Sequence, residues 1–291
     1  MDGFEIQPVP ALRAPVVVVA FGGWSDTGTV TTDTAQRLVD TNGGRSFLEV
    51  DPEDYYVFTD TRPTVKLDAF GLREVQWPKN EAFYALTPQS GHDLVVVKGV
   101  EPNLRWRTFT SRLGDAIAEL SPSLVCTLVA RPATTPHTRP IPISGSSADA
   151  SLAAKFGLGR SNYQGPTGIV GVLHDVLRRR GCPLISLVAS VPHYLNVEEN
   201  PPATMALLKA LTPVVGFTPA LGDLEEQGER FLERVEEASR GDDQIRAYVR
   251  SLEEHYGENE QESSDQGGGE LPSAADILRD VEDLLRGGSD S

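Results

Sequence analysis

The stretch PVVVVAF, residues 15–21, indicates the fold class of this chain. It is a continuous run of β-branched and aromatic side chains, which is typical of a strand buried on both faces of a parallel sheet. Three similar apolar runs follow along the chain: DLVVVKG (residues 93–99), SLVCTLVA (123–130) and CPLISLVASV (182–191). Together the four runs predict the central strands of one sheet.

Segments with helical spacing alternate with these runs. We expect helices over residues 26–40, 106–120, 149–156, 167–180 and 201–215. Residues 51–92 are irregular in pattern, with one or two further strands. Strands that alternate with helices imply a mainly parallel sheet covered on both faces, so we predict an α/β domain over residues 1–218.

The pattern changes after residue 218. Two segments with apolar positions at helical spacing, separated by Gly241, predict a helical hairpin over residues 219–256 that packs on the body. We expect residues 257–291 to be an acidic, flexible tail that contains a short amphipathic helix with Ile277, Val281 and Leu284 on one face. That helix is either a docking segment for a partner, or an appendage that is solvated or packs weakly on its own domain.

Charge is distributed unevenly along the 291 residues. The chain carries a net charge of −16, and residues 222–291 hold 21 acidic and 7 basic residues, which leaves −2 for the first 221. A nearly neutral body with an acidic tail argues against nucleic acid and anionic membranes as partners. Since no stretch approaches the roughly 20 apolar residues that span a bilayer, and no signal peptide is evident, we expect a cytoplasmic protein.

The loop after the first buried run, GGWSDTG, contains Gly23, Trp24 and Asp26. It lies at the carboxyl edge of the predicted sheet, where ligands usually bind, and it opens a helix whose N–H groups could hold an anion. However, it matches no phosphate-binding fingerprint, and Asp26 would repel a phosphate. A tight turn in which Asp26 caps the helix is the favoured interpretation.

Two further edge loops carry polar residues. VKGVEPNLRWRTF (residues 97–109) places Glu101 near Arg105 and Arg107, either as a polar site or as intramolecular ion pairs. The loop TTPHTRPIPISG (134–145) contains Pro136, His137 and Arg139. His137 beside Arg139 could act as a general base next to a cation, or the proline-rich loop could be a rigid surface for a partner.

Two other candidates follow in the sequence. SVPHY places His193 after Pro192, so the two histidines are expected to be neighbours, and with Asp26 they could bind a metal. Histidines that bond to backbone in stiff loops are the more common alternative. In YQGPTGIVGVL, Gly165, Pro166 and Gly168 surround a helix start and allow either close approach of another chain or tight helix–sheet packing.

Taken in order, GGWSDTG, VKGVEPNLRWRTF, PHTRPIPISGSS, YQGPTGIVGVL and SVPHY resemble the bacterial branch of the proteasome assembly chaperone-2 family. The resemblance implies a three-layer α/β sandwich similar to nucleoside phosphorylases and hydrolases. It also implies a homo-oligomer (a trimer or similar small ring) and binding of proteasome α-subunits without catalysis. We expect neither a cofactor nor a metal. Archaeal and eukaryotic members often dock through a C-terminal hydrophobic–Tyr–X motif, from which the ending RGGSDS departs.

Three functions are therefore open. The first is a chaperone-like protein that self-associates and binds protein partners through its edge loops. The second is an enzyme that uses the carboxyl edge for a nucleoside- or phosphate-type ligand. The third is an adaptor whose acidic tail does the binding.

Overall fold

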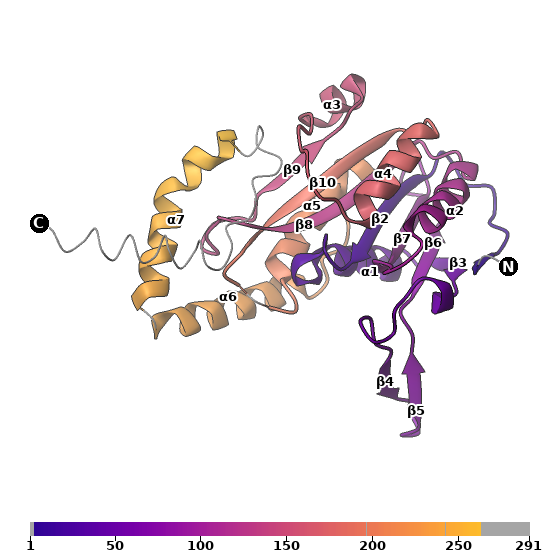
Figure 1. Ribbon diagram of the computed structural model, residues 1–291. Coiled ribbons are helices and arrows are strands. Elements are labelled where there is room, and N and C mark those ends of the chain that lie inside the picture. Colours follow the sequence, from indigo (N-terminus) through magenta and orange to yellow (C-terminus); the bar gives the residue numbers. More distant parts are fainter. Residues whose placement is uncertain (1–2, 196, 242, 263–291) are drawn as a thin grey trace, which may run out of the picture.

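The computed structural model describes residues 3–195, 197–241 and 243–262 (Figure 1). Its centre is an eight-stranded sheet with the order β1 (Phe4–Ile6), β3 (Arg45–Val50), β6 (Asn80–Ala85), β7 (Leu94–Val100), β2 (Val16–Gly22), β8 (Leu124–Ala133), β10 (Leu184–Pro192) and β9 (Ile143–Ser146). Among the helices that pack on the sheet or on its covering helices are α1 (Val30–Thr41), α2 (Trp106–Glu119), α4 (Ile169–Arg179), α5 (Pro201–Val215) and α6 (Leu224–Arg240). The remaining elements are α3 (Ala150–Phe156), α7 (Asp243–Glu262), the short 3₁₀ turns η1 (Thr27–Thr29) and η2 (Pro52–Asp54), and the separate hairpin β4 (Thr64–Leu67) and β5 (Arg73–Gln76).

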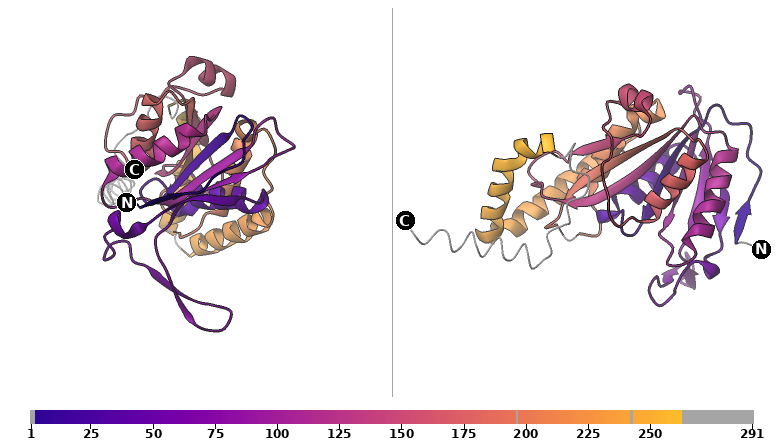
Figure 2. Two further views of the ribbon diagram at one scale, coloured as in Figure 1. Left: turned by 90° about the vertical axis from the view of Figure 1, so that its right-hand side faces the viewer. Right: turned by 45° about the horizontal axis from the view of Figure 1, so that its top comes forward.

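The central strand β2 is buried on both faces, as its sequence predicts. Successive side chains of a strand point to opposite faces. Val16, Val18 and Ala20 therefore pack into the core beneath α1 and α5. Val17, Val19 and Phe21 pack into the core beneath α2 and α4. The result is a sheet between two helical layers (Figure 2), and the predicted α/β sandwich is confirmed.

The four predicted buried runs form the parallel centre of the sheet. β2 pairs in parallel with β7 and β8, and β8 pairs in parallel with β10. Antiparallel strands extend the sheet on both sides. One of them corrects the sequence interpretation, because the end of the proline-rich loop is not a loop: Ile143–Ser146 forms β9, which covers the otherwise open side of β10.

The segment after residue 218 forms two helices. α6 packs against α5, and the α7 helix runs to Glu262, beyond the expected end at residue 256. Ile277, Val281 and Leu284 lie outside the described residues. The division into body, extension and tail stays a prediction. Within the described ranges, no helix has both the length and the apolar character needed to cross a membrane.

An ion pair between Arg13 and Asp93 links two chain segments at the amino end of the parallel strands. The buried Asp93 carboxylate accepts hydrogen bonds from the Arg13 backbone N–H (2.8 Å), the Arg13 guanidinium (2.8 Å) and the Thr87 N–H (3.0 Å). These bonds, led by that from the Arg13 side chain, lower the pKa of Asp93 to about 2. A buried carboxylate held in this way joins the chain before β2 to the start of β7.

We expect Asp93→Asn to lower the free energy of unfolding by about 2 kcal/mol at pH 7, because the charge-assisted bonds are weakened. Since the pKa of the folded state lies below the unfolded value of about 3.9, the stabilisation is present above that pH and is lost as the pH falls toward 2. Urea unfolding at pH 7, 4 and 2.5 measures this. The exposed Asp60→Asn is the control, and an Asp93→Asn variant with the pH slope of the parent would contradict the assignment.

Candidate functional site at the carboxyl edge of the sheet

The four parallel strands end at one edge of the sheet, and the candidate residues lie on the loops that follow them. They fall into two clusters. The first cluster joins the loops after β2 and β7 to the start of α4 and contains Gly23, Trp24, Glu101, Gly165, Pro166 and Gly168. The second joins the loops after β8 and β10 and contains Pro136, His137, Arg139, Pro192 and His193.

Glu101 holds the first cluster together. Its backbone N–H donates to the Gly22 carbonyl (2.8 Å). Its carboxylate accepts the Ile169 N–H with Oε1 (2.7 Å) and the Trp24 N–H with Oε2 (3.2 Å). The Ile169 N–H is the first of α4, where unpaired donors and the helix dipole favour a negative charge. Glu101 therefore links three segments of the chain by hydrogen bonds and does not form an open polar site.

Two glycines leave the space that the Glu101 side chain needs to make these bonds. Gly23 has φ +123°, and a Cβ there would lie 3.0 Å from the Glu101 Cβ. A Cβ on Gly168 would lie 3.1 Å from the Glu101 Oε1 and 3.2 Å from the Trp24 ring. The close approach that the glycine spacing predicts is thus an approach between segments of the same chain.

Asp26 lies between the two clusters and caps α1. Its Oδ1 accepts the Thr31 N–H (2.6 Å) and hydroxyl (2.7 Å), and its Oδ2 accepts the Thr32 hydroxyl (2.5 Å). The Asp26 side chain thus caps an N–H of the first turn, although α1 begins at Val30, with Thr29 at the N-cap position, and not at residue 26 as expected. The same bonds place a carboxylate where an anion would have to bind. The Ala130 N–H of β8 donates to the Ser25 carbonyl (2.8 Å), which ties this turn to the second cluster.

The two histidines are neighbours, as expected, and Tyr194 lies between them. The Tyr194 hydroxyl is 2.7 Å from both the backbone nitrogen and the Nδ1 of His137. The His193 Nδ1 lies 3.0 Å from the Ala133 carbonyl, and its Nε2 lies 3.1 Å from the Tyr248 hydroxyl on α7. The Tyr194 ring centroid is 5.8 Å from that of His137 and 5.6 Å from that of His193. The sequence interpretation missed Tyr194, although it directly follows His193.

This environment does not form the acid–base pair that His137 and Arg139 suggested. His137 is 8% exposed, whereas Arg139 faces solvent. Burial lowers the pKa of His137 and raises the pKa of Tyr194 to about 12, so both are neutral at pH 7. The suggested metal site is not formed either: the Asp26 carboxylate caps α1, and the described part of the chain contains no group of three or more potential ligands.

Helix α7 covers the proline-rich loop. Besides the contact of Tyr248 with His193, the Thr138 hydroxyl donates to the Glu253 carboxylate, and the Tyr256 hydroxyl donates to the Pro140 carbonyl (2.7 Å). The stiff loop therefore meets a surface of its own chain, more than 100 residues away in sequence. No local pattern identifies Glu253 and Tyr256 as partners of this loop, or Tyr248 as the partner of His193.

Three large apolar side chains face solvent around the first cluster. We call them the edge patch: Trp24 (63% exposed), Leu104 (46%) and Tyr163 (40%). Trp24 lies against Gly168, Leu104 follows Glu101 by three residues, and the Tyr163 hydroxyl donates to the Pro166 carbonyl (2.6 Å). Glu101, Asp26 and His193 thus bond to neighbouring segments. The buried Thr135 Oγ1 and His137 Nε2, however, have no hydrogen-bond partner among the described residues. The three apolar side chains of the edge patch face solvent.

A family model described as the PAC2 family matches residues 20–239. The chain belongs to the PAC2 family. Both clusters and the edge patch lie within the matched range, whereas residues 240–291 lie outside it. A comparison with curated proteins found no match.

Solved structures of PAC2 family proteins are similar over most of the chain. A PAC2 family protein from Streptomyces avermitilis is 39% identical, with a TM-score of 0.73 over 81% of this chain and 99% of its own. The Mycobacterium tuberculosis proteasome-assembly chaperone homologue Rv2125 is 38% identical, with a TM-score of 0.72 over 80% and 99%. Pyrococcus furiosus PbaB, an archaeal proteasome activator, shares the fold at 17% identity, with a TM-score of 0.66 over 81% and 98%.

For this PAC2 protein we expect Glu101→Ala to lower the free energy of unfolding by about 2 kcal/mol, because two backbone donors lose a charged acceptor. Glu101→Gln keeps one acceptor oxygen and should lose about half as much. Amide hydrogen exchange at Trp24 and Ile169 should accelerate in the same order. Glu119→Ala, at an exposed position at the end of α2, is the control. Unchanged exchange at both amides would show that Glu101 does not link these segments.

Proposed function

We propose that this PAC2 family protein is a cytoplasmic, proteasome-assembly-chaperone-like protein that self-associates and binds proteasome α-subunits without catalysis. The observation that carries the proposal is that polar side chains at the carboxyl edge bond to other segments of the chain and are not left open to a ligand. Glu101, Asp26 and His193 bond to neighbouring segments, while the edge patch faces solvent. A rigid edge with exposed aromatic side chains suits a protein partner better than a small polar ligand.

The names of the relatives support the proteasome as the partner. The 38% identical M. tuberculosis protein is a proteasome-assembly chaperone homologue, and PbaB is an archaeal proteasome activator. The competing hypothesis, an enzyme for a nucleoside- or phosphate-type ligand, needs unengaged polar groups at this edge. Asp26 is engaged by Thr31 and Thr32. The Nε2 of His137 has no hydrogen-bond partner in the described part of the chain, but it is buried and therefore not open to a ligand.

Native mass spectrometry of the full chain mixed with proteasome α-subunits tests the partner. We expect a complex, and a loss of affinity of about 30-fold for Trp24→Ala, because truncation of a central aromatic residue typically costs at least 2 kcal/mol. Leu86→Ala is the matched control: Leu86 is 56% exposed and follows β6 at the opposite edge of the sheet.

Other outcomes would decide against this partner or this surface. The absence of any complex with α-subunits would refute the chaperone role. A small-molecule mass retained on the purified chain would instead favour the enzyme. Loss of the complex only when residues 257–291 are removed would favour the adaptor.

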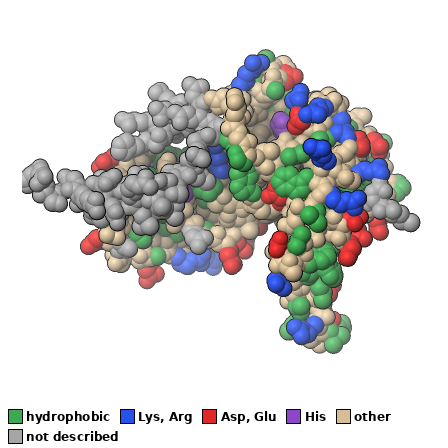
Figure 3. Space-filling view, in the orientation of Figure 1, with side chains coloured by type: hydrophobic (Ala, Val, Ile, Leu, Met, Phe, Trp, Pro, Cys, Tyr) green, Lys and Arg blue, Asp and Glu red, His purple; other side chains and the backbone are tan. Residues whose placement is uncertain are grey.

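The β4–β5 hairpin is the feature that supports self-association. It projects from the body (Figure 1), and its two faces differ. One face carries the cross-strand pair of Val65 and Val75, with the pair of Leu67 and Arg73 beside it. The other face carries the pair of Lys66 and Glu74. Figure 3 shows hydrophobic side chains gathered over this projection.

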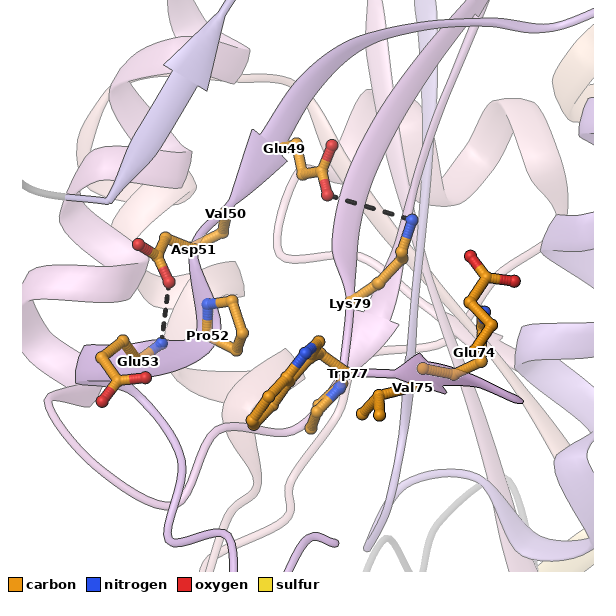
Figure 4. A pocket seen from close by; sticks show the side chains of 11 residues that line it. Glu49, Val50, Asp51, Pro52, Glu53, Glu74, Val75, Trp77 and Lys79 are labelled. Atoms are coloured by element: carbon orange, nitrogen blue, oxygen red, sulfur yellow. Dashed lines mark hydrogen bonds and ion pairs between the residues drawn. The ribbon is translucent and has the colours of Figure 1, made fainter. Parts of the chain in front are cut away.

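The apolar side chains of the hairpin are largely uncovered. The most exposed are Val65 (49%), Leu67 (68%), Phe70 (89%), Leu72 (66%), Val75 (50%) and Trp77 (47%). At the hairpin base, Trp77 contacts Phe58 and lines a pocket of about 280 Å³ (Figure 4). A two-stranded ribbon is marginally stable in water, and a patch of this kind marks a protein interface.

A second copy of the hairpin fits this patch in size and charge. The six side chains expose on the order of 600 Å², given 150–250 Å² for a whole aromatic side chain, so two facing copies would bury about 1,200 Å², the lower bound of a stable interface. Residues 64–77 carry two basic and two acidic side chains and are therefore neutral within a chain of net charge −16. Two hairpins can thus approach without repulsion between like charges.

We expect Val75→Glu to shift the protein from oligomer to monomer in sedimentation velocity, because it buries a charge in the apolar face. Gln76→Glu adds the same charge at the next residue on the polar face and should leave the oligomer intact. Equal behaviour of the two variants, or a parent protein that is monomeric at micromolar concentration, would refute this interface.

A further inference from the structure

The apolar stripe of α6 is covered only along its first half. Leu224 and Phe231 are buried, whereas further along the same stripe Val235 is half-buried and Ala238 is exposed. Here a groove of about 680 Å³ opens between α6, the loop after β10 and the first turn of α7. Its apolar lining consists of Leu195, Val197, Phe231, Val235, Ala238 and Ile245.

We propose that the groove is the docking site for a segment of the same chain, residues 273–286, whose sequence has the periodicity of an amphipathic helix. In that segment Ile277, Val281 and Leu284 recur at intervals of four and three. Phe231, Val235 and Ala238 recur on α6 with the same intervals. Two helices with matching rows of this kind pack ridges into grooves.

The length of the chain beyond α7 allows this return. α7 begins beside the groove, since Ile245 lines it, and at 1.5 Å per residue its 20 residues end about 30 Å away. Residues 263–272 can span about 33 Å when extended. The segment 273–286 can therefore run back alongside α7 and reach the groove.

The charges of the segment define how it lies in the groove. On a helix, Asp276, Asp280 and Asp283 flank the apolar row on one side, and Ala274, Leu278 and Leu285 flank it on the other. Arg234 lines the groove and flanks the α6 stripe. Glu198 and Glu199, on the loop after β10, also line the groove. We therefore place the acidic flank against Arg234 on α6, away from these two glutamates, and the apolar flank against the loop of Leu195 and Val197.

Disulfide trapping in the full chain tests this contact. Cysteines introduced together as Ala238→Cys and Ile277→Cys should oxidise within one chain, which intact and peptide mass spectrometry detect. The matched pair Ala238→Cys and Arg279→Cys places the second thiol on the opposite side of the helix and should react at least tenfold more slowly. Equal rates for the two pairs would overturn the proposal. Disulfides between chains would also overturn it, because they would assign the groove to a second copy.

Hydrogen exchange provides a second test that does not depend on introduced thiols. Val281→Gln should raise the exchange rate of amides 235–240 severalfold, whereas Glu282→Gln, a substitution at the neighbouring position, should not change it. Arg234→Glu should act like Val281→Gln, and Arg230→Glu should not, because Arg230 pairs with Glu226 on the exposed side of α6. No difference between the members of these pairs would refute docking in this groove. Neither test contains proteasome subunits, so its outcome is independent of the proposed partner.

Discussion

The burial of β2 on both faces and between two parallel neighbours is the constraint on which the rest of the structure depends. A strand in this position has no surface for function, since every side chain from Val16 to Phe21 is in the core. The same holds for most of β7 and β8. Groups that can contact a ligand or a partner therefore lie outside these strands, on the loops at their ends and on the elements around the sheet.

At the carboxyl edge, the loops are fixed by bonds to one another. Glu101 ties the turn after β2 to the start of α4, and the Ser25 carbonyl ties the same turn to β8. Beyond β8, the histidines and tyrosines connect the next loops to α7. Buried polar groups that are satisfied in this way make an edge rigid. A rigid edge loses little entropy when it binds another protein.

Much of the fold could be predicted from sequence because its signals are local. The four apolar runs gave strands with nearly the expected bounds, and the spacing of Leu224 and Phe231 indicated α6. The positions of the edge loops followed from the order of the elements. The bonding of Asp26 to the first turn of α1 could be expected because Thr31 and Thr32 follow it closely in sequence. The 3₁₀ turn Thr27–Thr29 between them, which moves the helix start to Val30, was not predicted.

The parts that could not be predicted depend on distant contacts. The pairing of His193 with Tyr248 spans 55 residues, and that of Thr138 with Glu253 spans 115. β9 is a strand only because β10 offers it an open edge, and neither Ser144 nor Gly145 signals this locally. The role of Glu101 was equally hidden, because its partners are backbone groups that any residue except proline carries.

That last property has an evolutionary consequence. Glu101 bonds to the backbone at positions 24 and 169 and makes no demand on the side chain of Trp24. The residue that faces outward can therefore diverge while the loop keeps its shape. Single substitutions at such positions could therefore change the surface chemistry of this edge without first lowering stability.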